Sequence, residues 1–279
     1  MAFKNLLVHV DDSKACAARV RAATDLAVAH EAHLCGVYVV SDPSPATFAG
    51  GYMPPELMEM LRRETGQRAE AALARFAEEA KRNQISFETR TDRVLYAALA
   101  DALATHARYA DVVILGQANP DDVDAARSLP EEVALASGRP TLVIPYIGPA
   151  ATLGQRVTVA WDASREAARA VNDALPILER AEAVGVVTVN PGETPFGHGE
   201  QPGADVALHL ARHGIKVEVQ RIESREVDVA NIILSHIADQ SSDLLVMGAY
   251  GHSRLRELVL GGVTRTILHD MTVPVLMAH

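Results

Sequence analysis

An internal repeat restricts the fold of this chain more than any other feature of its sequence. Residues 4–10 form a short apolar, β-rich run that leads into an acidic turn, and residues 156–161 do the same. The two halves also end alike, because residues 139–145 and 273–277 are apolar runs entered through a proline. Repetition of this kind indicates two similar domains in one chain.

The length of 279 residues fits two domains of ordinary size. We place them at residues 1–147 and 153–279, joined by a linker near residues 147–154 that contains Pro149, Ala150 and Gly154. We expect the last strand of each half to be the place where the two halves contact each other, as an intramolecular pseudo-dimer.

Short β-rich runs alternate with longer helical segments through both halves. We expect strands near residues 4–10, 33–40, 84–90, 111–116, 140–145, 156–161, 183–189, 215–222, 243–248 and 273–278. We expect helices near residues 14–30, 55–82, 93–108, 128–137, 164–180, 203–213, 226–240 and 257–269, with Ser13 and Ser164 as N-caps. The alternation predicts an α/β fold of two tandem Rossmann-like domains, each a five-stranded parallel sheet with helices on both faces.

Composition narrows the class of ligand and the cellular compartment. The formal net charge is −10, which argues against nucleic acid as the main ligand because phosphate backbones need clustered Lys and Arg. No apolar run reaches the roughly 18–20 residues of a membrane span, and the N-terminus does not resemble a signal peptide. The two cysteines, Cys16 and Cys35, are expected to be buried and reduced, so we expect a cytoplasmic protein.

Residues 243–268 contain the most informative motif. An apolar strand ends at Gly248, Gly251 follows after two residues, and Gly261 follows after nine more. Glycines let the backbone approach a ligand closely, and successive amides with a helix N-terminus can hold an anion. Gly262, Val263 and Thr264 come directly after the last of these glycines, and the hydroxyl of Thr264 is a further donor. The motif therefore predicts a phosphate site.

This glycine spacing resembles the phosphate-binding signature of the nucleotide-binding universal stress proteins. The stretch MGAYGHSRLRELVLGGVTRTIL, followed by VPVL, is similar to their C-terminal region, and VAWDASREAARAV is similar to their first strand and helix. The resemblance covers essentially the whole chain and is most specific in the second half. It implies two domains of the adenine nucleotide α-hydrolase-like type, with ATP, with or without Mg²⁺, as the ligand.

The resemblance assigns roles to single positions. Asp162 matches the acidic residue that contacts the nucleoside, and Val189 matches the position whose backbone lies beside adenine. The phosphate loop corresponds to Gly248, Gly251, Gly261, Gly262, Val263 and Thr264. Gly262 departs from the family, which usually has Ser or Thr there, so we expect weaker phosphate contact. From the residues alone, Asp162 could equally be a helix-capping group.

The first half has lost most of this motif. Gly116 is kept, but Asn119 stands in the second-glycine position. Three acidic residues, Asp121, Asp122 and Asp124, occupy the loop where phosphate would lie. Ser128 could replace a hydroxyl of the motif, but Pro130 lacks a donor N–H. We interpret the first half as a degenerate site.

Several other features have ordinary explanations. His209 and His213 share one helical face, which could suit a metal but is more typical of a solvated face, and no metal-site motif accompanies them. His252 and Arg254 could meet phosphate oxygens or be simply exposed. The Pro- and Gly-rich segment 41–55 could be a lid or a disordered loop.

The leading functional hypothesis is ATP binding in the second half, coupled to a stress response, without robust catalysis. One alternative is an ATP-hydrolysing or adenylating enzyme, against which stand the absence of GxxxxGK[ST] and GxGxxG motifs and of an evident catalytic base. A second alternative is a nucleotide-free, chaperone-like scaffold, which the Gly262 departure favours. Neither the protein partner nor the tendency of the whole chain to form a homodimer follows from the sequence.

Overall fold

The computed structural model describes residues 2–42, 54–95, 98–119, 128–148, 152–193, 201–224, 226–250 and 262–279. By its contacts the chain divides into two compact units. The N-terminal unit comprises Ala2–Gly116 and Pro120–Arg139, and the C-terminal unit comprises Gln117–Asn119 and Pro140–His279. Within the described residues, no helix is both long and apolar enough to cross a membrane.

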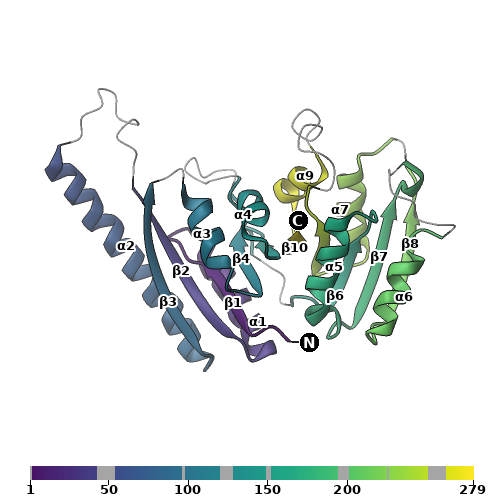
Figure 1. Cartoon of the computed structure of the whole chain (residues 1–279), viewed down its shortest axis with the longest axis horizontal. Coiled ribbons are helices and arrows are strands. Elements are labelled where there is room, and N and C mark those ends of the chain that lie inside the picture. Colours follow the sequence, from purple (N-terminus) through teal and green to yellow (C-terminus); the bar gives the residue numbers. More distant parts are fainter. Residues whose placement is uncertain are drawn as a thin grey trace. The chain divides into compact units, whose positions relative to one another are not determined.

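The N-terminal unit is an α/β layer structure with four described strands in the order β3-β2-β1-β4, each parallel to its neighbour. The long helix α2 lies along β2 and β3 (Figure 1). The elements are β1 (Asn5–His9), α1 (Cys16–His30), β2 (His33–Asp42), α2 (Pro55–Arg82), β3 (Phe87–Leu95), α3 (Leu99–Ala107), β4 (Val112–Gly116) and α4 (Leu129–Ser137).

The C-terminal unit repeats this arrangement and adds two strands, in the order β5-β10-β9-β6-β7-β8. Helix α5 packs on β9 and β10, helix α7 packs on α9 and β7, and α6 lies beside β8. Its elements are β5 (Thr141–Ile144), β6 (Arg156–Ala160), α5 (Arg165–Leu178), β7 (Ala183–Val189), the 3₁₀ turn η3 (Pro191–Glu193), α6 (Ala204–Arg212), β8 (Val217–Ile222), α7 (Val229–Asp239), β9 (Leu244–Gly248), α9 (Val263–Asp270) and β10 (Val275–Ala278).

Strand β5 belongs to the first half of the sequence but pairs with β10, the last strand of the second half. The pair is antiparallel, with Leu142 opposite Leu276 and Thr141 opposite Met277. The last strands of the two halves therefore contact each other, as the sequence predicts. The other described pairs in this unit are parallel, so the sheet is mixed but mostly parallel.

The central strands form the core of each unit. All residues of β4 except Gly116 are fully buried, and Leu244, Leu245 and Val246 of β9 are equally inaccessible. Strands covered on both faces require such continuous apolar runs, which is why these segments show no alternation in sequence. Cys16 and Cys35 are buried free thiols, as expected.

Two local expectations are wrong. The strand predicted at 84–90 runs instead from Phe87 to Leu95, because residues up to Leu95 pair with β2 as far as Asp42, so α3 begins at Leu99 rather than near residue 93. Ser13 is not an N-cap, since α1 begins at Cys16 with Ala15 as its N-cap, and no side-chain hydrogen bond caps it. Ser164 does cap α5, accepting a hydrogen bond from the amide of Ala167.

Candidate functional site

The candidate site lies at the carboxyl ends of the central strands of the C-terminal unit. Strand β6 is flanked by β7 and β9, and the chain leaves β6 toward β7 but returns to it through β9. This reversal is the topological switch point at which open α/β sheets bind ligands. Asp162 follows β6, Val189 ends β7 and Gly248 ends β9, so three of the predicted site residues share one edge.

The Asp162 carboxylate is partly buried and holds the turn that starts α5. Its Oδ1 accepts hydrogen bonds from the amide of Ser164 at 3.0 Å and from the Ser164 hydroxyl at 2.6 Å. Ala163, between them, has a φ of 61°, a left-handed conformation that costs an alanine on the order of 1 kcal/mol or more. Among the described residues, no cationic side chain pairs with Asp162. Its second oxygen is therefore a candidate acceptor for a ligand hydroxyl.

Gly248 lets the end of β9 approach the first turn of α5. A Cβ added at Gly248 would lie 2.5 Å from the Ala167 nitrogen and 2.8 Å from the Glu166 carbonyl carbon, which is closer than real side chains approach backbone. Any other residue would push the α5 N-terminus away from this edge. The glycine therefore has a packing role, and its effect is to place a helix N-terminus beside Asp162.

A second helix N-terminus comes from α9. Gly262 is the N-cap, and it provides no side-chain hydrogen bond to the helix. The amides of Val263 and Thr264 precede the first intrahelical bond, which Arg265 donates to the Gly262 carbonyl, so they have no helical acceptor. The buried Thr264 hydroxyl accepts a bond from the Tyr250 amide at 3.3 Å, which ties α9 to the end of β9. Gly251, Gly261, His252 and Arg254 lie outside the described residues.

Sequence reasoning missed Asn190, which follows Val189. Asn190 has a φ of 47° and joins the ends of β7 and β8 through its side chain. Its Nδ2 donates to the Ser224 carbonyl at 2.8 Å, and its Oδ1 accepts from the Ser224 amide at 2.9 Å. These bonds hold the Val189 backbone in place at the site edge. An asparagine directly after a strand was the available signal, because Asn tolerates positive φ.

The N-terminal unit has a buried ion pair at the matching place, the turn that follows its first strand. Asp11 follows β1 as Asp162 follows β6, and Gly116 ends β4 as Gly248 ends β9. The Arg19 guanidinium, almost fully buried, lies 2.7 Å from the Asp11 carboxylate and donates through Nε to the His9 carbonyl at 2.7 Å. It also occupies the space that a side chain on Gly116 would need. In the second half the position matching Arg19 is Ala170.

The charges at this turn are strongly coupled. Burial alone would raise the pKa of the Asp11 carboxyl, but the nearby Arg19 charge, with His9 and hydrogen bonds from Ser13 and Arg19, holds that pKa well below its usual range. Burial, assisted by the Arg19 charge, lowers the pKa of His9 to about 4, which the Asp11 carboxylate only partly opposes. Asp11 is thus a paired anion, whereas no partner of the second Asp162 oxygen is present among the described residues.

The remaining predicted positions of the first half do not form a phosphate loop among the described residues. The Ser128 hydroxyl donates to the Glu132 carboxylate at 2.5 Å, and Pro130 is buried in the first turn of α4. Asp121, Asp122 and Asp124 lie outside the described residues. The imidazole rings of His209 and His213 meet edge to face at 4.9 Å, and no group of three or more metal-ligating side chains forms in the part of the chain that the structure describes.

Comparison with known proteins places the chain in a family. The model of the universal stress protein family matches residues 2–145 and again residues 154–279. A universal stress protein from Synechocystis sp. is 39% identical over 67 residues, which are 24% of this chain and only 22% of the length of that relative.

Two solved structures share the fold along nearly the whole chain. A universal stress protein from Archaeoglobus fulgidus superposes with a TM-score of 0.74 at 17% identity, covering 98% of this chain and 95% of its own. A protein of unknown function from Pseudomonas aeruginosa superposes with a TM-score of 0.61 at 15% identity, covering 99% and 92%. With the family model matched in both halves, the chain belongs to the universal stress protein family and contains two of its domains in tandem.

Proposed function

We propose that the protein binds one adenine nucleotide, ATP, at the carboxyl edge of β6, β7 and β9, and that it acts in stress-response regulation rather than in robust catalysis. The observation that carries this proposal is the contrast between Asp162 and Asp11. Asp162 has no cationic partner among the described residues, whereas Asp11 is neutralised by Arg19 at 2.7 Å. A carboxylate without a cationic partner accepts hydrogen bonds from a ribose more favourably than one whose charge an arginine already neutralises.

The phosphate end of the proposed site rests on the α9 N-terminus and on the glycine spacing in the sequence. The amides of Val263 and Thr264 are unpaired by the helix and carry the positive end of its dipole. Gly251 and Gly261 belong to this proposal by sequence alone. Gly262 contributes its amide but no hydroxyl, and Val189 contributes backbone at the adenine end.

The nucleotide would also bring Mg²⁺ as a counter-ion of its phosphates. The only acidic side chain assigned to the site is Asp162, which lies at the nucleoside end, and among the described residues no group of three or more metal-ligating side chains forms. The glycine motif itself carries no evident catalytic base or metal-binding carboxylate pair, which is one reason to favour binding and signalling over ATP hydrolysis.

We further propose that the two halves act as an intramolecular pseudo-dimer. The antiparallel pairing of β5 with β10 supports it, because each is the last strand of its half. In this arrangement the second half binds ATP and the first half provides a matching, nucleotide-free partner.

A matched pair of substitutions tests the proposal. Asp162→Asn should weaken ATP about 10- to 100-fold, the value of a charge-assisted hydrogen bond of about 1.5–3 kcal/mol, and affect inorganic triphosphate much less. Asp11→Asn, the same change in the first half, should leave ATP affinity unaltered. Calorimetric titration gives both affinities, and the stoichiometry of the parent protein should be near one ATP per chain.

Two results would contradict the proposal. A stoichiometry of two would mean that the first half also binds, and equal losses in the two variants would remove the assignment of Asp162. Mass spectrometry of denatured, freshly purified protein separates the alternatives further. Carried-over ATP supports binding, ADP indicates turnover, and no nucleotide favours a scaffold.

A further inference from the structure

A hollow of about 500 Å³ lies away from the proposed nucleotide site, at the amino-terminal ends of β6, β7 and β8. The first residues of these strands, Arg156, Ala183 and Val217, line it, and helix α7 forms one wall. Its volume falls within the roughly 300–1,000 Å³ of small-molecule sites. We call this space the polar hollow, and its central residues are Thr158, Gly185, Gln220, His236 and Ser242.

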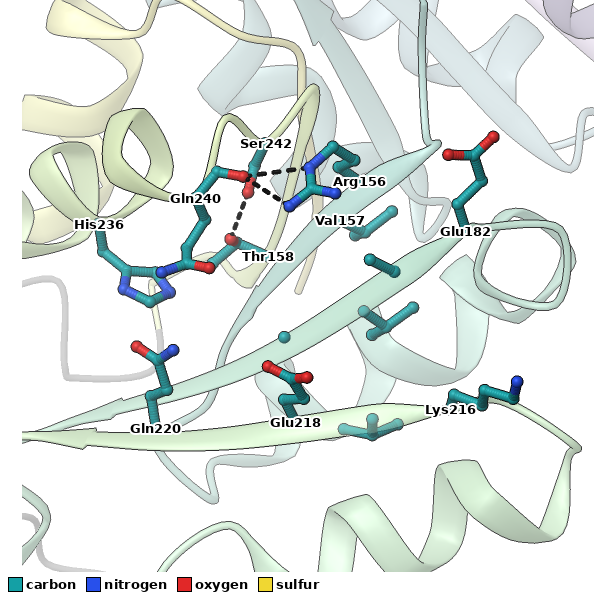
Figure 2. A pocket seen from close by; sticks show the side chains of 14 residues that line it. Arg156, Val157, Thr158, Glu182, Lys216, Glu218, Gln220, His236, Gln240 and Ser242 are labelled. Atoms are coloured by element: carbon teal, nitrogen blue, oxygen red, sulfur yellow. Dashed lines mark hydrogen bonds between the residues drawn. The ribbon is translucent and has the colours of Figure 1, made fainter.

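The floor of the polar hollow is a row of three residues on one face of the sheet. Thr158 pairs with Gly185, and Gly185 pairs with Glu218, so the three side-chain positions point the same way. A Cβ added at Gly185 would meet no atom within 4 Å, which shows that the space above this glycine is open. Figure 2 shows Gln220 and Glu218 extending from β8 toward His236.

At the first two positions of the matching row, the N-terminal unit carries apolar side chains. There Leu7 pairs with Cys35 and Cys35 pairs with Glu88, in the register of the second half. Leu7 and Cys35 belong to a buried apolar cluster that also includes Ala110, the residue before Asp111. The corresponding residue before Asp243 is Ser242, because both aspartates accept amide hydrogen bonds from the start of the first strand.

The second half has therefore replaced Leu7, Cys35 and Ala110 with Thr158, Gly185 and Ser242. Two of these changes introduce hydroxyls, and the third removes a side chain. The Thr158 and Ser242 hydroxyls lie 2.8 Å apart, both on buried residues, and share one hydrogen bond. Since apolar packing would stabilise the fold more than an open polar space, the substitutions favour a ligand over a structural purpose.

The histidine of α7, His236, also stands in a different environment from its counterpart in the N-terminal unit. His106 and His236 each stand eighth in their helices, and in the N-terminal unit Asp92 lies 3.4 Å from the His106 imidazole. The strand position matching Asp92 is Ile222 in β8, since Val39 pairs with Asp92 and Val189 with Ile222. Burial lowers the pKa of His236, which the charge of Asp239 only partly opposes, so the imidazole is neutral at pH 7 and has one donor and one acceptor nitrogen.

The lining of the polar hollow carries balanced charge. Arg156 and Lys216 are cationic, Glu182 and the floor residue Glu218 are anionic, and the Arg156 guanidinium already donates to the Gln240 carbonyl at 3.1 and 3.2 Å (Figure 2). Neither sign dominates, and the uncharged polar groups of the lining are hydroxyls, side-chain amides and a neutral imidazole. Such groups are complementary to hydroxyls, each of which donates and accepts.

We propose that the polar hollow binds a small uncharged polyhydroxylated molecule, of the polyol or monosaccharide class. The molecule rests on Gly185 and exchanges hydrogen bonds with Thr158, Ser242, His236 and Gln220. This site is separate from the nucleotide edge, which lies at the opposite ends of the same strands.

The test follows amide resonances of the full chain by NMR during titration with myo-inositol, sorbitol and glucose. At least one of these probes should shift the amides of Thr158, Gly185 and Ser242 in a saturable way. Gly185→Leu should abolish the response, because its side chain enters open space and fills the hollow. The matched control is Gly192→Leu, where an added Cβ also meets nothing within 4 Å but the residue lies beyond the other end of β7.

A gentler variant keeps the proposal testable if Gly185→Leu fails to fold. Thr158→Val preserves shape and removes one hydroxyl, so it should weaken binding about three- to ten-fold, the worth of one neutral hydrogen bond. The proposal is overturned if none of the three probes gives a saturable shift, or if folded Gly185→Leu responds as the parent does. It is equally overturned if only the charged probes glycine or inorganic phosphate saturate the site.

Discussion

The turn after the first strand differs between the two halves of the protein. We call the turn around Asp11 and Arg19 the closed corner, because its carboxylate is ion-paired, and the matching turn around Asp162 and Ala170 the open corner. In the N-terminal unit, Arg19 pairs with Asp11 and fills the space beside Gly116. In the C-terminal unit, Ala170 replaces the arginine, and Asp162 bonds only to the turn that it organises, as far as the described residues show. A single position, eight residues after the aspartate, therefore separates the ion-paired carboxylate from the one that we propose to contact a ligand.

The comparison predicts first that Arg19→Ala strongly destabilises the protein. Removing one partner of a buried ion pair usually costs about 3–5 kcal/mol, and we expect about 3 kcal/mol because the Asp11 side chain remains 27% exposed. Urea denaturation monitored by circular dichroism measures the loss. Arg21→Ala, an exposed arginine on the same helix, should change stability by no more than about 0.5 kcal/mol. A similar loss in both variants would show that the ion pair does not support this corner.

The second prediction concerns pH, because His9 belongs to the closed corner and its counterpart in the second half is Ala160. The native pKa of His9, about 4, lies below the value of 6.5 in the unfolded chain, so the unfolded chain binds the proton first as pH falls. Stability is complete above pH 6.5 and is lost progressively down to about pH 4. At about 1.4 kcal/mol per pH unit, lowering the pH from 7 to 5 should cost about 2 kcal/mol through His9.

His9→Gln isolates this contribution. The variant should lose about 2 kcal/mol less than the parent between pH 7 and pH 5, since other titrating groups, His236 included, act in both proteins. Denaturation curves at the two pH values give the difference. Parallel pH dependence in parent and variant would mean that His9 titrates normally in the folded protein.

The third prediction transfers the closed corner to the second half. Ala170→Arg should place a guanidinium beside Asp162 and Gly248 and weaken ATP about 10- to 100-fold, because the carboxylate would then be neutralised as Asp11 is. Asn172→Arg adds the same charge at an exposed position of α5 and serves as the control. Calorimetry measures both affinities, with circular dichroism to verify folding. Unchanged ATP binding in folded Ala170→Arg would separate the open corner from nucleotide recognition.

The smallest expected effect is at the α9 N-cap. Gly262→Ser supplies the hydroxyl that the family usually carries at this position, and we expect it to tighten ATP about three- to ten-fold if one neutral hydrogen bond to phosphate forms. Inorganic triphosphate should gain by a similar factor, because the contact is to phosphate. A gain confined to helix stability, with no change in either affinity, would assign the hydroxyl to capping alone.

Sequence reasoning located the regular elements well where periodicity or burial was strong, as in α2, whose bounds at Pro55 and Arg82 agree with the prediction. It failed at β3. Pairing with the long strand β2 extends β3 to Leu95, into residues that the sequence assigned to the start of the next helix. It also treated Ser13 and Ser164 alike, although only the second caps its helix. Strand pairing depends on neighbours that are distant in the chain. The two serines differ only in where the helix begins, since both bond to the aspartate two residues before them.

The amino-acid sequence by itself determined the tandem repeat, the α/β class, the family and the loss of the glycine loop from the first half, because these properties are carried by local pattern and spacing. Only the tertiary structure showed that Asp11 is paired with Arg19 while no described cation pairs with Asp162, and it alone revealed the polar hollow over Gly185. Arg19 meets Gly116, and Thr158 meets Ser242, across stretches of about 80 to 100 residues. Contacts between residues so far apart exist only once the strands have aligned, so no local pattern announces them.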